Sequence, residues 1–146
     1  MSRLAVVLTL ILAGAAALLA GCGSKGPTTS ERLELYRSHA GEPVSRFRLT
    51  RTFRWTSLGD DAVAVWPRVN EGFLLEFRSR CSGLSSARDI SISNAGDWVM
   101  ARFDSVQLRG PMSTTGTQQC RIWSIRPLDA RALNDARAEM REARAV

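Results

Sequence analysis

The side chains that could perform chemistry are few in this chain, and their spacing matches no catalytic grouping. His39 is the single histidine, so a Ser-His-Asp triad or a histidine metal site would have to use it. It lies beside Gly41 near an expected helix end, which favours a solvated position over a general base. Asp60, Asp61 and Asp97 fall in expected turns, where aspartate bonds the local backbone. No GxSxG motif and no glycine-rich phosphate loop accompanies them, so we expect a protein that is not an enzyme and that uses no metal or cofactor.

The first cysteine, Cys22, closes an apolar run that begins after Arg3. A basic start, an apolar stretch and small residues before the cleavage point are the three parts of an export signal. The segment LAGC resembles the lipobox of bacterial lipoproteins, which implies cleavage before Cys22 and acylation of its thiol and new amine. A transmembrane anchor is the alternative, since about 18 apolar residues approach a membrane span. The many Ala and Gly residues and the small-residue end favour the export signal.

Acylation would tether the mature protein to a bilayer, because two or three acyl chains hold a protein stably where one does not. We expect a signal peptide over residues 1–21 and a flexible tether over residues 22–30, which are rich in Gly, Ser, Thr and Pro. Gly23, rather than Asp, follows the cysteine and favours the outer membrane, facing the periplasm. The expected partners are the lipid bilayer, through Cys22, and an anionic envelope component or an envelope protein.

The other two cysteines, Cys81 and Cys120, would meet an oxidising compartment in the cell envelope. Two remaining cysteines allow one connectivity, so we expect a Cys81–Cys120 disulfide. A metal or redox pair is the alternative. It is disfavoured because the chain has no CxxC motif and one histidine.

Arginine dominates the basic residues: the net charge is +6, and Lys25 is the one lysine. Arginine pairs with phosphate and carboxylate groups, which points to an anion-binding surface, although a GC-rich genome is the simpler explanation. An envelope location argues against nucleic acid as a partner. Arg46, Arg48 and Arg54 share one parity in VSRFRLTRTFRWTS. They predict either the solvated side of a half-buried strand, which we favour, or an anion-binding face.

The expected elements are two helices and about six strands. A capping box from Thr28 to Glu31 opens a helix near residues 30–40, and Asp129 caps a C-terminal helix over 131–146 whose end can fray. The strands are expected over 46–56 with a bulge, bend or break near 50–52, over 62–66 closed by Pro67, and over 73–77, 90–92, 98–108 and 120–125. One helical turn or a loop is expected over 82–88.

Strand parity assigns side chains to faces. Phe73, Leu75, Phe77 and Cys81 share a face of their strand. In the last strand, Cys120 and Ile122 should face one side, with Trp123 and Ile125 on the other, so both sides should be covered. In the long strand over 98–108, Arg102 and Asp104 share a face, and a partly buried ion pair is favoured there over a ligand site.

Turn-linked strands predict antiparallel pairing. We therefore expect an α+β domain over residues 31–130: a mostly antiparallel curved sheet or small barrel of about six strands, with short N-terminal and C-terminal helices.

The chain resembles a known family in three segments: GFLLEFRSRCSGL (72–84), RFDSV (102–106) and CRIWSIRPLD (120–129). They resemble a family of small proteobacterial lipoproteins that carry a domain of unknown function. Its pattern pairs a cysteine after an aromatic-led strand with a cysteine opening a C-R-I-x-x-I-R segment. The resemblance covers roughly residues 42–130 and supports the Cys81–Cys120 bond, but it implies no activity, ligand or catalytic residue.

The leading functional hypothesis is a non-enzymatic, lipid-anchored interaction or envelope-maintenance module. The alternative is an inhibitor of a periplasmic or host hydrolase that acts through the polar loop over residues 110–119. A hydrolase is the third and weakest hypothesis.

Overall fold

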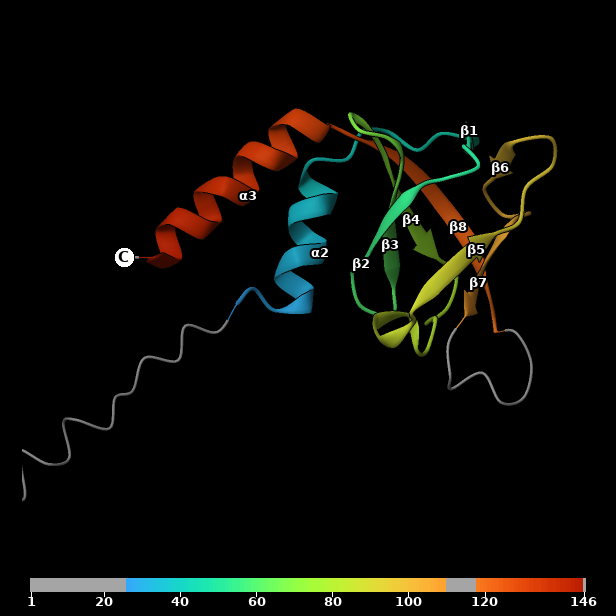
Figure 1. Ribbon diagram of the computed structural model, residues 1–146, viewed down its shortest axis with the longest axis horizontal. Coiled ribbons are helices and arrows are strands. Elements are labelled where there is room, and N and C mark those ends of the chain that lie inside the picture. Colours follow the sequence, from blue (N-terminus) through green and yellow to red (C-terminus); the bar gives the residue numbers. More distant parts are fainter. Residues whose placement is uncertain (1–25, 110–117, 146) are drawn as a thin grey trace, which may run out of the picture.

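The computed structural model describes residues 26–109 and 118–145. Its main layer is a six-stranded antiparallel sheet curled into a half-barrel, flanked by helices α2 (Thr29–Ser38) and α3 (Ala130–Ala145) (Figure 1). The strands are β1 (Arg46–Arg48), β2 (Arg54–Ser57), β3 (Ala62–Arg68), β4 (Glu71–Phe77), β5 (Asp89–Ile92), β6 (Trp98–Met100), β7 (Ser105–Arg109) and β8 (Gln119–Leu128). One 3-10 turn, η2 (Leu84–Ser86), follows β4. The α+β class and the curved antiparallel sheet are confirmed.

The strand order of the large sheet is β2-β3-β4-β8-β7-β5. Strands β1 and β6 form a separate two-stranded sheet, with Phe47 opposite Val99. The long central strand β8 joins the two halves of the large sheet, because it pairs with β4 along one part and with β7 along the other. Within the described residues, β2 and β5 each have one neighbouring strand, so they are the two edges of the half-barrel.

Strand β3 shows how both faces of the sheet are covered. Val63 and Val65 belong to the core inside the curl, whereas Ala62 and Ala64 belong to a second core under the helices. Successive strand residues point to opposite faces, so the alternation of valine and alanine separates the two cores. The second core contains Leu33 and Tyr36 of α2 and Leu133 of α3, which pack over the small alanine side chains.

Both helices begin where the sequence predicts their caps. The Thr28 hydroxyl accepts a hydrogen bond from the Glu31 N–H at 3.2 Å, and the Glu31 carboxylate accepts one from the Thr28 N–H at 2.7 Å. This box satisfies N–H groups that the first turn leaves free, so α2 takes in Thr29 and Ser30 from the expected tether. At the other helix, the Asp129 carboxylate accepts from the Ala132 N–H at 3.0 Å.

The expected strand over 46–56 is broken, as predicted, and its halves β1 and β2 belong to different sheets. The expected end of the next strand at Pro67 is wrong, since β3 continues to Arg68. The β3–β4 register shifts between Val65 and Arg68, and a proline without an N–H is tolerated at such an irregularity. The expected turn over 82–88 is confirmed as η2.

The predicted single strand over 98–108 is wrong, because the chain turns between β6 and β7. Arg102 has φ +71°, and the Asp104 carboxylate accepts a hydrogen bond from the Met100 N–H at 2.7 Å. The Ser93 hydroxyl donates to the other Asp104 carboxylate oxygen at 2.7 Å. Asp104 therefore stabilises a tight turn instead of sharing one face of a regular strand with Arg102.

Strand β8 carries a bulge that sequence parity cannot reveal. Its register with β4 shifts between Glu76 and Phe77, whose partners are Ser124 and Ile122, so Trp123 is the additional residue. Ile125 consequently joins Ile122 in the core, whereas 44% of Trp123 is exposed. The prediction that Trp123 and Ile125 share a covered face is wrong for this reason.

Candidate functional site

The main candidate site is a cleft between the two edges of the half-barrel. It has a volume of about 530 Å³ and lies between the segment 49–55, which leads into β2, and strand β5. In Figure 1 both edge strands lie in the foreground, nearer the viewer than β3 and β4. Its lining includes apolar side chains that are also part of, or packed against, the core inside the curl: Leu49, Phe53, Trp55, Ile90 and Ile92. This volume lies in the range typical of ligand sites, about 300–1,000 Å³.

The backbone of β2 presents hydrogen-bonding groups to this cleft. The Leu58 N–H donates to the Ala62 carbonyl oxygen at 3.0 Å, which fixes the phase of the β2–β3 ladder. In an antiparallel pair the bonded residues alternate, so Thr56 bonds toward β3 and Trp55 does not. The Trp55 N–H and C=O therefore point away from β3, toward the open edge.

Strand β5 also has backbone groups that its neighbouring strand leaves unbonded. The Ser93 N–H donates to the Ser105 carbonyl oxygen at 3.0 Å, so Ser91, two residues earlier, also bonds toward β7. The backbone groups of Ile92 then point away from β7, although its side chain is buried in the core. Strand-edge backbone groups of Trp55 in β2 and of Ile92 in β5 therefore belong to residues that line the cleft.

Charged side chains of both signs lie around the cleft. Arg51, Asp89, Asp97 and Arg109 line it, and all four are exposed. Within the described ranges, no ion pair joins any of these four side chains to another residue. The cleft therefore combines a mostly polar surface, some apolar side chains and charges that remain open to a ligand.

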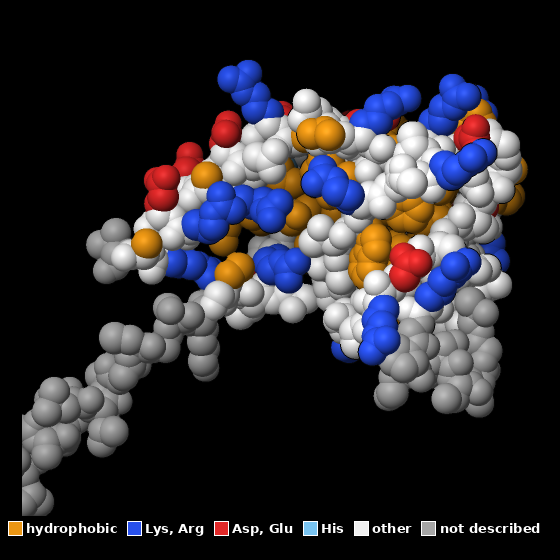
Figure 2. Space-filling view, viewed as in Figure 1, with side chains coloured by type: hydrophobic (Ala, Val, Ile, Leu, Met, Phe, Trp, Pro, Cys, Tyr) orange, Lys and Arg blue, Asp and Glu red, His pale blue; other side chains and the backbone are white. Residues whose placement is uncertain are grey.

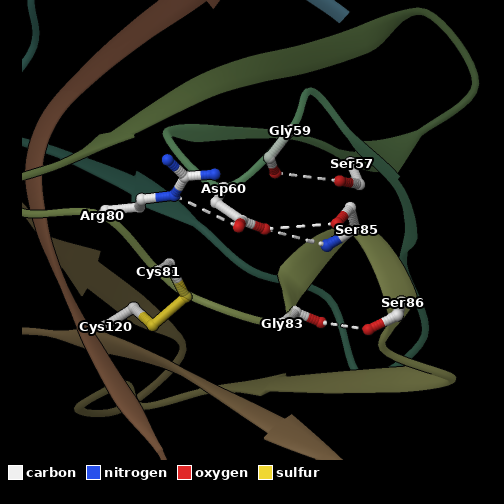
Figure 3. Close-up of a disulfide and its surroundings, with 9 residues drawn as sticks. All are labelled: Ser57, Gly59, Asp60, Arg80, Cys81, Gly83, Ser85, Ser86 and Cys120. Atoms are coloured by element: carbon white, nitrogen blue, oxygen red, sulfur yellow. Dashed lines mark hydrogen bonds and ion pairs between the residues drawn. A yellow bond between two sulfur atoms is a disulfide. The ribbon is translucent and has the colours of Figure 1, made fainter.

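A buried disulfide cross-links the half-barrel between β4 and its neighbouring strand β8. Cys81 and Cys120 are bonded, with their Cα atoms 5.5 Å apart and both side chains buried (Figure 3). The bond joins the segment after β4 to the start of β8. The predicted pairing is confirmed in the structure.

Asp60 secures the same region through hydrogen bonds (Figure 3). Its carboxylate accepts from the Ser85 N–H at 3.3 Å, the Ser85 hydroxyl at 3.2 Å and Arg80 Nε at 3.4 Å. Its carbonyl oxygen accepts from the Cys81 N–H at 2.7 Å. Partial burial raises the pKa of Asp60, but the bonds from Ser85 and Arg80 outweigh it and hold that pKa below the ordinary value.

The three arginines of the expected basic face are exposed but lie in two sheets. Arg46 and Arg48 belong to β1, and Arg54 belongs to β2. The Arg46 guanidinium lies over the Trp98 ring, 4.4 Å from its centroid. The break between β1 and β2 means that these arginines do not form one row along one strand.

Two arginines lie over the ring of Trp123, which is 44% exposed, in an arrangement that the sequence does not reveal. The guanidinium groups of Arg102 and Arg78 lie 4.6 and 5.6 Å from the centroid of the Trp123 ring. The expected Arg102–Asp104 ion pair is therefore wrong: Arg102 contacts an aromatic ring, and Asp104 bonds Ser93 and a backbone N–H. Beside Arg102, Phe103 is 73% exposed.

The candidate catalytic and metal-binding residues occupy structural positions. His39 Nδ1 lies 2.8 Å from the Leu35 carbonyl oxygen, so it donates to the last turn of α2. Asp97 has φ +69° in the turn before β6, and its carbonyl oxygen accepts from the Leu49 N–H at 2.8 Å. Among residues 26–109 and 118–145, no group of three His, Cys, Asp or Glu side chains is arranged to hold a metal ion.

Some of the predicted features lie outside the described residues. They are the signal peptide, Cys22 and residues 110–117 of the loop assigned to the hydrolase-inhibitor hypothesis. In the described part of the chain, no helix has the length and apolar character needed to cross a membrane.

Comparison with known proteins gives one match. No curated protein and no solved structure matches this chain. The model of a family of unknown function, DUF6491, matches residues 4–144, which is nearly the whole chain. The chain therefore belongs to the DUF6491 family.

Proposed function

We propose that this protein is a lipid-anchored, non-enzymatic module of the bacterial envelope that binds an extended segment of another envelope protein. The segment enters the cleft between β2 and β5 as an added strand. The observation that carries the proposal is the pair of edge strands that line the cleft, with Trp55 and Ile92 backbone groups that point away from β3 and β7. A free edge is a ready template for another chain, and β-augmentation is a recurrent mode of peptide recognition.

The contents of the cleft favour a polypeptide over other ligands. Backbone edges supply alternating donors and acceptors, which another backbone complements in full. The half-buried Phe53 and Trp55 can contact side chains that point inward from an added strand, and Arg51 and Asp89 can select charged neighbours. We expect no nucleic acid partner, because the envelope is a compartment without it.

The anchor in this proposal is Cys22, acylated after removal of residues 1–21. The lipobox-like LAGC segment supports it, and the Cys81–Cys120 disulfide accords with an oxidising compartment. Gly23 favours the outer membrane, with the domain facing the periplasm. The module then acts within reach of the membrane surface, on proteins of the periplasm or of the membrane itself.

The test uses a pair of variants that differ in one backbone N–H. Trp55→Pro removes the outward N–H of β2 while leaving the β2–β3 ladder bonds, since proline is tolerated at edge positions of this kind. Trp55→Val removes the same indole but keeps the N–H. A photocrosslinker at Ser91, on the opposite wall of the cleft, captures the partner in living cells.

We expect the full-length protein and Trp55→Val to crosslink one extended segment of a protein, and Trp55→Pro to lose that product. Both variants must retain the wild-type circular dichroism spectrum. Equal crosslinking by both variants would show that the edge N–H plays no part, and the strand-addition proposal would be rejected.

Inhibition of a hydrolase is the second candidate, and one observation favours it. Phe103 projects from a turn whose carbonyl groups at Arg102 and Phe103 both accept from Arg121 Nη1 at 3.1 Å. A rigid, protruding aromatic side chain can enter an enzyme cleft with little loss of conformational entropy. If the captured partner is a hydrolase, its activity should fall on addition of this protein and recover with Phe103→Ala.

A further inference from the structure

A second hollow lies between the two helices, apart from the cleft of the half-barrel. Figure 1 shows α3 running beside α2 and extending away from the sheet. The hollow has a volume of about 270 Å³, and its apolar lining consists of Pro27, Leu35, Tyr36 and Met140. It is smaller than sites for drug-sized ligands, which start near 300 Å³, so it suits a small group such as a lipid headgroup.

The rest of this lining is basic. Four arginines line the hollow: Arg32 from α2, and Arg137, Arg141 and Arg144 from α3. Arg32 donates to a backbone carbonyl oxygen of β2, and Arg144 forms an ion pair with Glu31 at 3.7 Å. Within the described residues, neither Arg137 nor Arg141 is in an ion pair. An anionic group in the hollow would therefore meet two guanidinium groups, those of Arg137 and Arg141, that have no competing carboxylate partner.

The sequence of α3 separates its charges by face. Arg137, Arg141 and Arg144 recur at intervals of four and three residues and line the hollow together. The acidic residues of α3 follow the same spacing on the opposite face: Asp135, Glu139 and Glu142. Figure 2 shows blue side chains gathered between the helices and red ones along the outer side of α3. The hollow is consequently a local concentration of positive charge.

The hollow also lies close to the expected membrane anchor. Pro27 lines it, and Cys22 precedes Pro27 by five residues, which span at most about 18 Å when fully extended. With Cys22 acylated, the hollow cannot move far from the headgroups of the bilayer. This step rests on the lipid anchor in the proposed function, but not on the cleft between β2 and β5.

We propose that the hollow between α2 and α3 binds the phosphate-bearing headgroup of an anionic phospholipid in the membrane that holds the anchor. Guanidinium groups pair with phosphate through two parallel hydrogen bonds, and Met140 and Leu35 offer apolar contacts to the first carbons of the acyl chains. The contact fixes the orientation of the domain on the bilayer. The half-barrel, at the other end of the molecule from the tip of α3, then faces away from the surface (Figure 1).

The test uses the complete lipidated protein in two kinds of vesicle, one of phosphatidylcholine and one that also contains phosphatidylglycerol. The anchor is present in both, so flotation with either vesicle reports the anchor alone. Amide hydrogen exchange of α3 reports the hollow, with the amides of β8 as an internal reference. We expect phosphatidylglycerol to slow exchange in α3 at least threefold at low salt. About 1 M salt should remove the effect, since the Debye length there is about 3 Å.

Two double variants that lose the same charge distinguish binding in this hollow from general electrostatic attraction between the protein and the vesicle. Arg137→Gln with Arg141→Gln should abolish the effect of phosphatidylglycerol, whereas Arg48→Gln with Arg54→Gln, on β1 and β2, should retain it. An α3 that exchanges equally in both vesicles would overturn the proposal. An equal loss of the phosphatidylglycerol effect in both double variants would also overturn the proposal. Slower exchange in native envelopes, without any effect of phosphatidylglycerol, would assign the hollow to an acidic protein instead. Failure of flotation would reject the anchor.

Discussion

Replacing Cys81 and Cys120 together by alanine removes a covalent link between the segment after β4 and the start of β8. The bonded cysteines are 39 residues apart in the sequence. In the folded protein the two segments stay together without the bond, because Asp60 accepts from the Cys81 N–H and Ile122 packs in the core. The main effect of the change therefore falls on the unfolded chain.

The magnitude follows from loop closure. The chain-entropy relation gives about 13 cal/mol/K for a loop of this length, which is about 4 kcal/mol at room temperature. Both side chains are buried, so their truncation also leaves small voids that add to the loss. Domains of this size are usually stable by about 5–15 kcal/mol, so the double variant should lose a large part of its free energy of unfolding.

The assay is denaturation by urea, followed through tryptophan fluorescence. Reduction of the wild-type protein is the matched control, because it opens the bond without removing the sulfur atoms. We expect the double variant and the reduction of the wild-type protein each to lower the free energy of unfolding by about 4 kcal/mol, with the larger loss in the variant. A loss below about 1 kcal/mol on reduction would contradict the reasoning, as would free thiols at both positions in protein taken from the envelope.

Three further predictions concern the anchor, the Asp60 contacts and the packing of β4. Cys22→Ser should abolish incorporation of a clickable fatty acid and leave the precursor uncut; unchanged labelling would refute the lipobox interpretation. Asp60→Asn should cost about 1–3 kcal/mol at neutral pH by urea denaturation. The pKa of Asp60 lies below its ordinary value of 3.8. The wild-type protein should therefore keep its full stability advantage over Asp60→Asn above about pH 4 and lose it as the pH falls further. A difference in stability that does not change with pH would contradict this. Gly72→Ala should destabilise the protein by about 1–3 kcal/mol, because a Cβ there would overlap the Trp66 ring; an unchanged melting temperature would show that the ring moves freely.

Local sequence signals predict the parts of this fold that depend on neighbouring residues. The Thr28–Glu31 capping box locates the start of α2 to within a residue or two, because the contacts that define it are three residues apart. The parity of Phe73, Leu75 and Phe77 correctly assigns one face of β4 to the core inside the curl. The disulfide follows from the number of cysteines and the expected compartment.

Features that depend on distant partners are not predictable in this way. The bulge at Trp123 reflects the pairing of β8 with β4, and the turn at Arg102 depends on a bond from Ser93 to Asp104. The cleft could not be located from the sequence either, since β2 and β5 are far apart in the chain and come to line one cleft only through the curl of the sheet. The hollow between the helices likewise combines arginines from both ends of the domain.

The most direct test of strand addition is residue-level amide exchange of the lipidated protein, free and with the segment identified by crosslinking. We expect strong additional protection of the Trp55 and Ile92 amides, whose N–H groups point away from β3 and β7. The amides of Thr56 and Ser93 already bond within the sheet and should change little. If the segment binds and all four amides keep the exchange rates of the free protein, the cleft does not receive an added strand.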